Sequence, residues 1–244
     1  MRIGIIETGK PSATLEELFG DYPFMFEQLI GATLGDASFF TKCIVSGEKT
    51  GAPEQADGWL ITGSRHGAYD RQPWIEPLEE FIRECFAKSK PMIGVCFGHQ
   101  IIAQAMGGKV QKSNKGWAVG PEKYNISNKP DWMTHLSKTY TSHAIHQDQI
   151  IEIPKNATVI SSSGFCEFAG LLYGNPDAPN AITVQSHPEL SDGFVKKIGA
   201  ERLAKVVPEH TLKAGLARLG TEVNNAEWGK TFSQYFQRAI TANS

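Results

Sequence analysis

The chain has 244 residues, of which 41% are hydrophobic and 20% are charged, so it can bury a full core as one large domain or two small ones. Its 24 Lys and Arg residues against 26 Asp and Glu residues give a formal net charge of −2. That balance leaves no basic excess to neutralise a phosphate backbone, and nucleic-acid binding is not expected.

Targeting and redox features are also absent from the sequence. The apolar stretch 3–6 is too short for a signal peptide, and the longest uncharged run, 91–108, is too short and too polar to span a bilayer. The four cysteines form no CxxC pair and are too few for a disulfide framework. We therefore expect a cytoplasmic protein with reduced thiols that binds no membrane.

The first half of the chain alternates short β-branched runs with helical patterns. Strands are predicted at 3–7, 39–45, 58–62 and 91–95. Helices are predicted at 26–34, 78–86 and 98–106. Strands and helices that alternate at this spacing are typical of βαβ units, and they predict a parallel sheet covered on both faces.

The second half of the chain has a different pattern. From 109 to 184, short strands alternate with turn residues. After Glu189 the pattern is helical again, and an apolar face near the end is predicted to dock on the sheet. That face consists of Trp228, Phe232, Tyr235, Phe236, Ala239 and Ile240. No linker composition interrupts the chain, so the sequence predicts a single α/β domain.

A cysteine stands where the strand 91–95 runs directly into a helix, in the pattern Gly94-x-Cys96-x-Gly98. This is the sulfur version of a nucleophile elbow, in which two small residues allow a sharp turn that exposes the side chain above the carboxyl edge of the sheet. A helix N-terminus favours a thiolate placed there and directs N–H groups toward a developing oxyanion. Taken alone, the pattern is equally compatible with a buried, inert cysteine between two packing glycines.

A second segment, His187-Pro188-Glu189, follows the predicted strand 181–184. A cysteine nucleophile needs an imidazole within hydrogen-bonding reach, and the imidazole needs an acceptor that orients it. Pro188 fixes the backbone so that His187 and Glu189 project to the same side. A cysteine elbow and this segment, in this order, favour a Cys–His–Glu site.

These two motifs resemble those of the class I, triad-type glutamine amidotransferase domains and their γ-glutamyl hydrolase relatives. The resemblance covers residues 3–192 and also rests on the loop 62–65 and the segment 146–148. It is greatest to the stand-alone, GMP-synthetase-like group that includes γ-glutamyl peptidases. It implies a flavodoxin-like three-layer α/β fold with a central, mostly parallel sheet and a small antiparallel region. The domain would span 1–244, with a helical extension over about 190–244.

The resemblance assigns a role to each matching residue. The implied catalytic residues are Cys96 as nucleophile, His187 as general base and acid, and Glu189 as the group that orients His187. The implied oxyanion hole uses the backbone N–H of Phe97 and an N–H from Gly63 or Ser64, a choice that stays open because many members have two glycines there. The implied substrate-binding residues are Gln100, Gly116, Trp117 and Asp148. No metal and no cofactor are expected.

One position departs from the synthetase-linked members of the family. Many of those members carry Phe before His-Pro-Glu, whereas this chain has Ser186. A small residue there resembles the peptidase-like members, and it is predicted to widen the site beside His187.

The implied activity is hydrolysis of the γ-amide of glutamine or of a γ-glutamyl compound through a γ-glutamyl thioester, with release of ammonia or an amine. Two alternatives stay open: a glutaminase subunit that delivers ammonia to a separate synthetase, and a thiol stress sensor or chaperone on a similar sheet. The long segment after Glu189 and the lack of a synthetase module favour a stand-alone hydrolase. Its expected partner is a small-molecule γ-glutamyl substrate; a synthetase partner or a homo-oligomer is also open.

The other cysteines and histidines receive structural interpretations. Cysteines in apolar-patterned segments are predicted to be inert core residues, and these are Cys43, Cys85 and Cys166. Histidines without ligand-like spacing are predicted to be solvated or hydrogen-bonded, and these are His66, His135, His143 and His210. His99, inside the helix after the elbow, is expected to pack or bond locally.

Overall fold

The computed structural model describes residues 1–242, and in this range two sheets carry the strands. The strands are β1 (Arg2–Glu7), β2 (Ser38–Cys43), β3 (Gly58–Ile61), β4 (Met92–Val95), β5 (Lys109–Lys112), β6 (Ala118–Ile126), β7 (Thr139–His146), β8 (Asp148–Glu152), β9 (Ala157–Ser162), β10 (Gly170–Asn175) and β11 (Ala178–Val184). The helices are α1 (Ala13–Phe19), α2 (Tyr22–Leu34), α3 (Ile75–Ala87), α4 (Phe97–Ala105), α5 (Asp192–Glu201), α6 (Glu209–Leu216) and α7 (Asn225–Ala242). Short 3₁₀ turns lie at Ile44–Ser46, Pro53–Gln55 and Leu203–Lys205.

The large sheet has the strand order β2-β1-β3-β4-β11-β10-β9-β6-β7. Strands β2, β1, β3, β4 and β11 are parallel neighbours, and from β11 onward the pairing is antiparallel. Strands β5 and β8 form a separate antiparallel pair. The predicted fold class is confirmed, although the second strand ends at Cys43 rather than at residue 45, because the chain turns there into a 3₁₀ helix.

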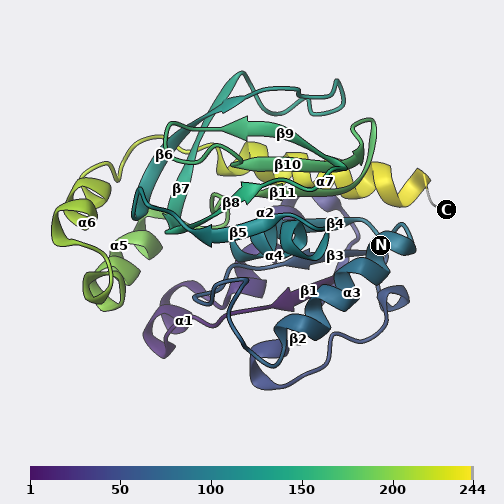
Figure 1. The fold of residues 1–244 in the computed structure, drawn as a ribbon, viewed down its shortest axis with the longest axis horizontal. Coiled ribbons are helices and arrows are strands. Elements are labelled where there is room, and N and C mark those ends of the chain that lie inside the picture. Colours follow the sequence, from purple (N-terminus) through teal and green to yellow (C-terminus); the bar gives the residue numbers. More distant parts are fainter. Residues whose placement is uncertain (243–244) are drawn as a thin grey trace.

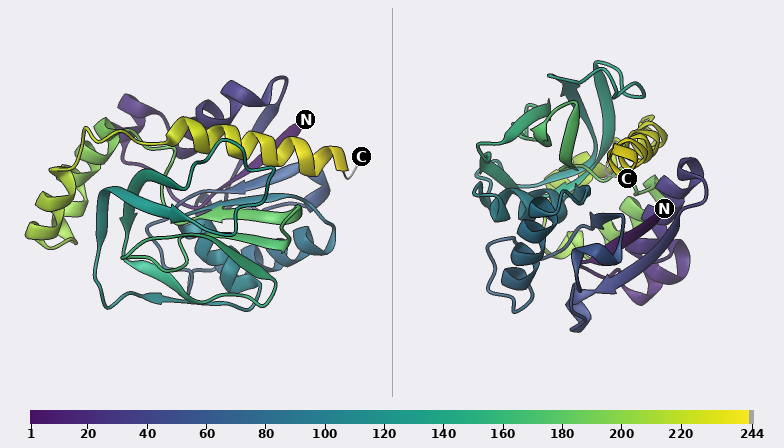
Figure 2. Two further views of the ribbon diagram at one scale, coloured as in Figure 1. Left: turned by 90° about the horizontal axis from the view of Figure 1, so that it is seen from above. Right: turned by 90° about the vertical axis from the view of Figure 1, so that its right-hand side faces the viewer.

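Helices cover both faces of the parallel strands, as Figure 1 shows. Side chains alternate along β1, so that Ile3 and Ile5 pack toward α2 and α7, whereas Ile6 belongs to the core under α3 and α4. The predicted docking of the last helix is confirmed, since its aromatic residues Trp228, Phe232, Tyr235 and Phe236 are buried in the core with Phe26 and Ile30 of α2. Figure 2 shows α7 running lengthwise beside the strands.

The last helix is also tied to the sheet by one tyrosine. The hydroxyl of Tyr235 accepts a hydrogen bond from the backbone N–H of Met92, at 3.1 Å, and donates one to the carbonyl of Asn180, at 2.7 Å. Tyr235 therefore joins α7 to the starts of β4 and β11, the two strands that lead to the predicted catalytic segments.

Because the central strands are parallel, their carboxyl ends meet at one edge of the sheet. Val95 at the end of β4 pairs with Val184 at the end of β11, and Ile61 of β3 pairs with Gly94. Helices α5 and α6 lie at this edge, at the end of the molecule opposite both termini (Figure 1). The loops that carry the predicted site residues thus emerge side by side.

We expect Tyr235→Phe to lower the free energy of unfolding by about 1–3 kcal/mol, because it leaves the buried N–H of Met92 and the carbonyl of Asn180 without their partner. Urea denaturation followed by tryptophan fluorescence measures this loss. Gln237→Ala, at an exposed position of the same helix, is the control and should change stability by less than about 0.5 kcal/mol. Equal stability of Tyr235→Phe and wild type would contradict the anchoring role.

Candidate active site

The turn between β4 and α4 places Cys96 at the N-terminus of the helix. Cys96 has φ 53° and ψ −101°, a positive φ that few residues other than glycine adopt. Its N–H donates to the carbonyl of Val184 at 2.8 Å, and its carbonyl accepts from the N–H of Gln100 at 3.1 Å. The residue is only 5% exposed, so the thiol is less accessible than the sequence predicts and meets solvent through a cavity.

Two glycines make this turn possible. A Cβ on Gly98 would lie 2.2 Å from the carbonyl oxygen of Ile61, and a Cβ on Gly94 would lie 2.6 Å from the carbonyl oxygen of Gly98. Backbone atoms cannot move aside as a flexible side chain can. The strand, the turn and the neighbouring strand β3 therefore approach so closely that only glycine fits at both positions.

The imidazole of His187 lies between the thiol of Cys96 and a carboxylate. Its Nδ1 is 2.6 Å from Oε1 of Glu189, whose side chain is 1% exposed, and the ring is hydrogen-bonded to Cys96. The backbone N–H of His187 donates to the carbonyl of His143 at 2.8 Å, which fixes the chain after β11 against β7. The structure thus brings the three predicted catalytic residues together.

The charge balance around His187 favours its protonated form. Burial alone lowers the pKa of an imidazole, but the carboxylate of Glu189 and the thiolate form of Cys96 oppose it. The attraction of these groups prevails, and the pKa of His187 is raised well above its ordinary value. An imidazolium held in this way can stabilise a neighbouring thiolate.

The loop after β3 presses against the same imidazole. A Cβ on Gly63 would lie 2.9 Å from Cε1 of His187 and 3.7 Å from Cβ of Cys96. The loop is held by Thr8, which was not identified from the sequence: its Oγ1 lies 2.9 Å from the carbonyl of Thr62 and 3.0 Å from that of Gly63. A polar residue after the first strand is too common to signal this role.

Two backbone segments adjoin Cys96, the start of α4 and the loop after β3. Phe97 is the first residue of α4, so its N–H has no acceptor within the helix. A Cβ on Gly63 would lie 3.7 Å from Cβ of Cys96, and the Oγ of Ser64 closes a turn in this loop by accepting from the N–H of His66 at 3.1 Å.

A cavity of about 200 Å³ opens beside Cys96. Of the residues predicted to contact substrate, Gln100, Trp117 and Asp148 line it, as does Ser64. Gly116 does not line it; with φ +81° and open space around its Cα, it provides the turn that precedes Trp117.

Asp148 is held in a network at the base of the cavity. Its carboxylate is hydrogen-bonded to Tyr69, and burial raises the pKa of that carboxyl. The side-chain Nε2 of Gln100 donates to the carbonyl of Asp148 at 2.9 Å and to Oε1 of Gln185 at 3.0 Å. Gln100 thereby holds the backbone at Asp148 in place. His146 also bonds that carbonyl, at 3.1 Å, and burial lowers its pKa to about 4, so its ring is neutral at pH 7.

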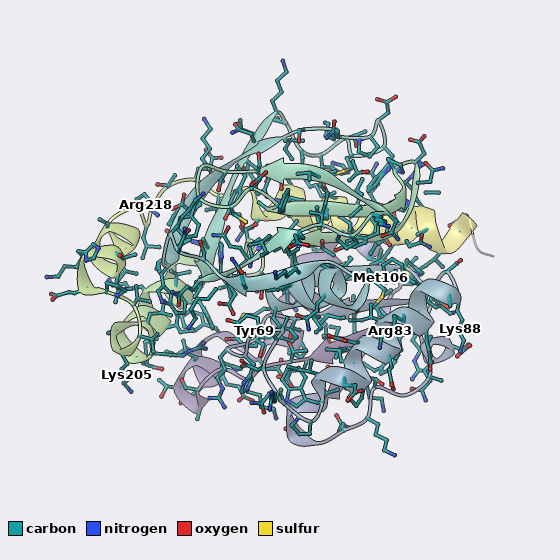
Figure 3. All side chains as sticks on the ribbon, viewed as in Figure 1. Tyr69, Arg83, Lys88, Met106, Lys205 and Arg218 are labelled. Atoms are coloured by element: carbon teal, nitrogen blue, oxygen red, sulfur yellow. The ribbon has the colours of Figure 1, made fainter. Side chains whose placement is uncertain are left out.

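Several cavity residues were given no binding role in the sequence analysis, although two of them, Arg65 and Gln147, lie in segments that carried the resemblance. They come from loops and helix ends that only the tertiary structure brings together: Arg65, His66, Tyr69, Asp70, Lys112, Ile145, Gln147 and Arg202. Tyr69, labelled in Figure 3, lies in the loop between β3 and α3. Arg202 follows α5 and lies beyond every motif that was recognisable in the sequence.

The prediction that Ser186 widens the site is wrong. Ser186 is fully buried, lines neither this cavity nor the small hollow beside His187, and packs near the hydroxyl of Tyr140. Ser186 therefore faces the core, whereas the adjacent His187 lines the small hollow.

Cys85, Cys166 and His99 agree with their structural interpretations, whereas Cys43 is not a core residue: it is only partly buried, at the end of the edge strand β2. Burial raises the pKa of the thiols of Cys43, Cys85 and Cys166, that of Cys166 to about 12. None of these three residues lines the cavity. His99 bonds Oγ1 of Thr183 at 2.7 Å and the carbonyl of Phe168 at 2.8 Å, and burial lowers its pKa to about 3.

Two other kinds of feature are missing from residues 1–242. Within this range, no group of three or more His, Cys, Asp or Glu side chains is arranged to hold a metal ion. The same part of the chain contains no helix with the length and apolar character needed to cross a bilayer.

Known proteins share both the sequence pattern and the fold. The family model described as Glutamine amidotransferase class-I matches residues 42–197. Gamma-glutamyl peptidase 4 of Arabidopsis thaliana is 31% identical over 191 residues, which are 71% of this chain and 70% of that protein. A glutamine-hydrolyzing GMP synthase subunit of Methanococcus aeolicus is 28% identical over 119 residues, 49% of this chain and 61% of that protein.

A solved structure supports the architecture. The glutamine amido transferase of Methylobacillus flagellatus superposes with a TM-score of 0.73 over 98% of this chain and 94% of that one, at 21% sequence identity, a level that speaks for the fold alone. The family model, by contrast, matches the sequence itself over more than half of the chain and includes both the cysteine turn and the His-Pro-Glu segment. The chain belongs to the class I glutamine amidotransferase family.

Proposed function

We propose that this protein hydrolyses the γ-amide of a γ-glutamyl compound, with Cys96 as nucleophile, His187 as general acid and base, and Glu189 as the orienting carboxylate. The observation that carries the proposal is the contiguous hydrogen-bonded series from Cys96 through His187 to Glu189, at a strained turn that opens into a cavity. Similarity to a gamma-glutamyl peptidase and to a subunit of a glutamine-hydrolyzing synthase supports the same reaction class.

The proposed reaction has two halves. In the first, the Cys96 thiolate adds to the γ-carbonyl carbon, and the N–H of Phe97 with one N–H of the Gly63–Ser64 loop holds the oxyanion. The intermediate collapses to a γ-glutamyl thioester as the C–N bond breaks, and His187 donates its proton to the leaving nitrogen. In the second, His187 takes a proton from water, whose hydroxide attacks the thioester and releases glutamate and the thiol.

The cavity provides the contacts that such a substrate needs. The partly buried carboxylate of Asp148 is an acceptor for the α-ammonium group of the glutamyl unit. Trp117 closes the adjacent wall of the cavity, and Gln100 holds the Asp148 backbone in place. Burial disfavours the ionised form of Asp148, and the positive charge of a bound substrate ammonium would stabilise that form.

A glutaminase subunit that feeds a synthetase is the second candidate, favoured by the similarity to a subunit of GMP synthase. One feature supports the stand-alone enzyme instead: the apolar face of α7 is covered within the chain itself, against α2 and the sheet. The thiol-sensor alternative is disfavoured, because Cys96 is 5% exposed and already engaged by His187.

The nucleophile can be tested among the chain's four cysteines. We expect Cys96→Ala to lower kcat/KM for amide hydrolysis by at least about 10³-fold, because no other group can form the thioester. Cys43→Ala, Cys85→Ala and Cys166→Ala, compared at equal folded concentration, should retain activity. Ammonia or amine release measures the rate; full activity of Cys96→Ala would refute the mechanism.

The orienting carboxylate has a signature in the pH profile. Glu189→Gln should lower kcat/KM by about 10²–10⁴-fold. It also removes the charge that raises the pKa of His187, so burial then dominates and the imidazolium is lost at lower pH. The alkaline limb of the kcat/KM profile should move down by about 1–3 pH units.

Asp192→Asn is the matched control for Glu189→Gln. It removes an equal charge whose effect is on His143, and we expect it to leave the pH profile in place. If the alkaline limb of the kcat/KM profile lies at the same pH in Glu189→Gln and in wild type, the role proposed for Glu189 is contradicted.

The choice between the two candidate functions needs the purified chain alone. We expect it to cleave γ-glutamyl amides without a second protein, because the cavity and the catalytic groups are already assembled in the isolated chain. Steady-state product release with glutamine and a panel of γ-glutamyl dipeptides measures this. Cleavage of glutamine alone, and only after a synthetase is added, would favour the role of a glutaminase subunit.

A further inference from the structure

Two buried threonine hydroxyls meet beside the loop that follows β3. Thr8 comes directly after β1, Thr62 comes directly after β3, and neither is exposed to solvent. Their Oγ1 atoms are 3.1 Å apart, and the backbone N–H of Thr8 donates to Oγ1 of Thr62 at 3.0 Å. We call Thr8 and Thr62 the threonine pair.

The threonine pair holds two consecutive carbonyl groups. Oγ1 of Thr8 lies 2.9 Å from the carbonyl oxygen of Thr62 and 3.0 Å from that of Gly63. Oγ1 of Thr62 lies 3.2 Å from the carbonyl oxygen of Gly63. Each hydroxyl has one proton to donate, so the pair has one proton for each of the two oxygens.

The contact with Thr8 gives the orientation of the peptide group between Gly63 and Ser64. Residues 1–242 contain no cis peptide bond, and in a trans peptide the N–H points away from the carbonyl. Strand β3 lies between β1 and β4, so the loop after it has Thr8 on one side and Cys96 on the other. Because the carbonyl of Gly63 faces Thr8, the N–H of Ser64 faces the side of Cys96.

The N–H of Ser64 has no acceptor of its own. It donates to no group within residues 1–242, and Ser64 lines the cavity that also reaches Cys96. The N–H of Gly63 is oriented differently, because the carbonyl of Thr62 accepts from the N–H of Gly98 at 3.2 Å. The N–H of Gly63 therefore points away from the first turn of α4, where the oxyanion donor on Phe97 lies.

We infer that the threonine pair fixes the peptide between Gly63 and Ser64 so that the N–H of Ser64 donates to the oxyanion. The inference rests on the proposed function and adds Thr8 to it as a positioning residue, which does not line the cavity and acts through the carbonyl of Gly63. Glycine tolerates many backbone conformations, so this peptide would rotate more easily without the hydroxyls. After such a rotation, the carbonyl of Gly63 would face the oxyanion and repel it.

Thr8→Val tests this role, because it replaces the hydroxyl by a methyl group of similar size. We expect it to lower kcat for glutamine or a γ-glutamyl amide by about 10–10²-fold, within the loss that removal of one oxyanion donor causes. KM should change by less than about 3-fold, because no residue that lines the cavity is replaced. Steady-state release of ammonia or amine, at equal folded concentration, measures both constants.

Alkylation of Cys96 by iodoacetamide separates this role from a merely structural one. The reaction needs the thiolate but forms no oxyanion. Its rate at Cys96, followed by mass spectrometry, should stay within about 3-fold of wild type in Thr8→Val. Thr8→Ser keeps the hydroxyl and should restore kcat to within about 3-fold of wild type.

Thr231→Val is the matched control. Thr231 is equally buried, does not line the cavity, and donates from Oγ1 to the carbonyl of Glu227 in α7 at 2.8 Å. Its replacement should leave kcat, KM and the alkylation rate unchanged. If Thr8→Val does not fold, Thr8→Ala takes its place, since it also lacks the hydroxyl and sets no methyl group against the two carbonyls.

Three results would overturn the inference and leave the proposed function standing. These are an unchanged kcat in the variant without the hydroxyl, equal losses in hydrolysis and alkylation, and a Thr8→Ser variant as slow as the variant without the hydroxyl. If wild type hydrolyses neither glutamine nor any γ-glutamyl amide, the proposed function itself fails and the inference fails with it.

Discussion

The backbone of Cys96 is the constraint on which the site depends. A non-glycine residue with φ 53° costs of the order of 1–3 kcal/mol and persists only where its surroundings impose it. Here β3 and β11 flank β4 on both sides, and Gly98 lies close to the carbonyl of Ile61. These contacts hold the backbone of Cys96 in its positive-φ conformation. The stability of the sheet therefore maintains a conformation that is locally unfavourable.

The second requirement is that both halves of the large sheet are present. Parallel strands position Cys96 and the Gly63 loop, whereas β7 of the antiparallel half provides the carbonyl of His143 that holds His187 and leads directly to Asp148 at the start of β8. The three charged or chargeable groups of the series lie largely out of water, so their interactions are little screened. The interactions among Cys96, His187 and Glu189 and the assembly of the large sheet thus depend on the same topology.

The parts of the site that could be predicted from sequence are those encoded locally. Gly94, Cys96 and Gly98 lie within five residues, as do His187 and Glu189, and strand ends in a parallel sheet meet at one edge. The parts that could not be predicted depend on long-range packing.

Thr8, Tyr69 and Arg202 illustrate this limit. Each reaches the site from a different loop or helix end, and no spacing in the chain relates them to Cys96. The prediction for Ser186 failed for a simpler reason: proximity in sequence to His187 does not give the side of the chain on which a side chain lies. The fold class was predictable because many residues along the whole chain contribute to its hydrophobic periodicity. The orientation of one side chain leaves no comparable pattern in the sequence.

The position of α7 has a consequence for how the protein is made. Its aromatic residues cover a core that includes Ile3 and Phe26, and the helix is the last element of the described chain. During synthesis on the ribosome, that apolar face stays uncovered until residues 225–242 have emerged. Until that point the nascent chain carries an exposed hydrophobic surface to which chaperones can bind.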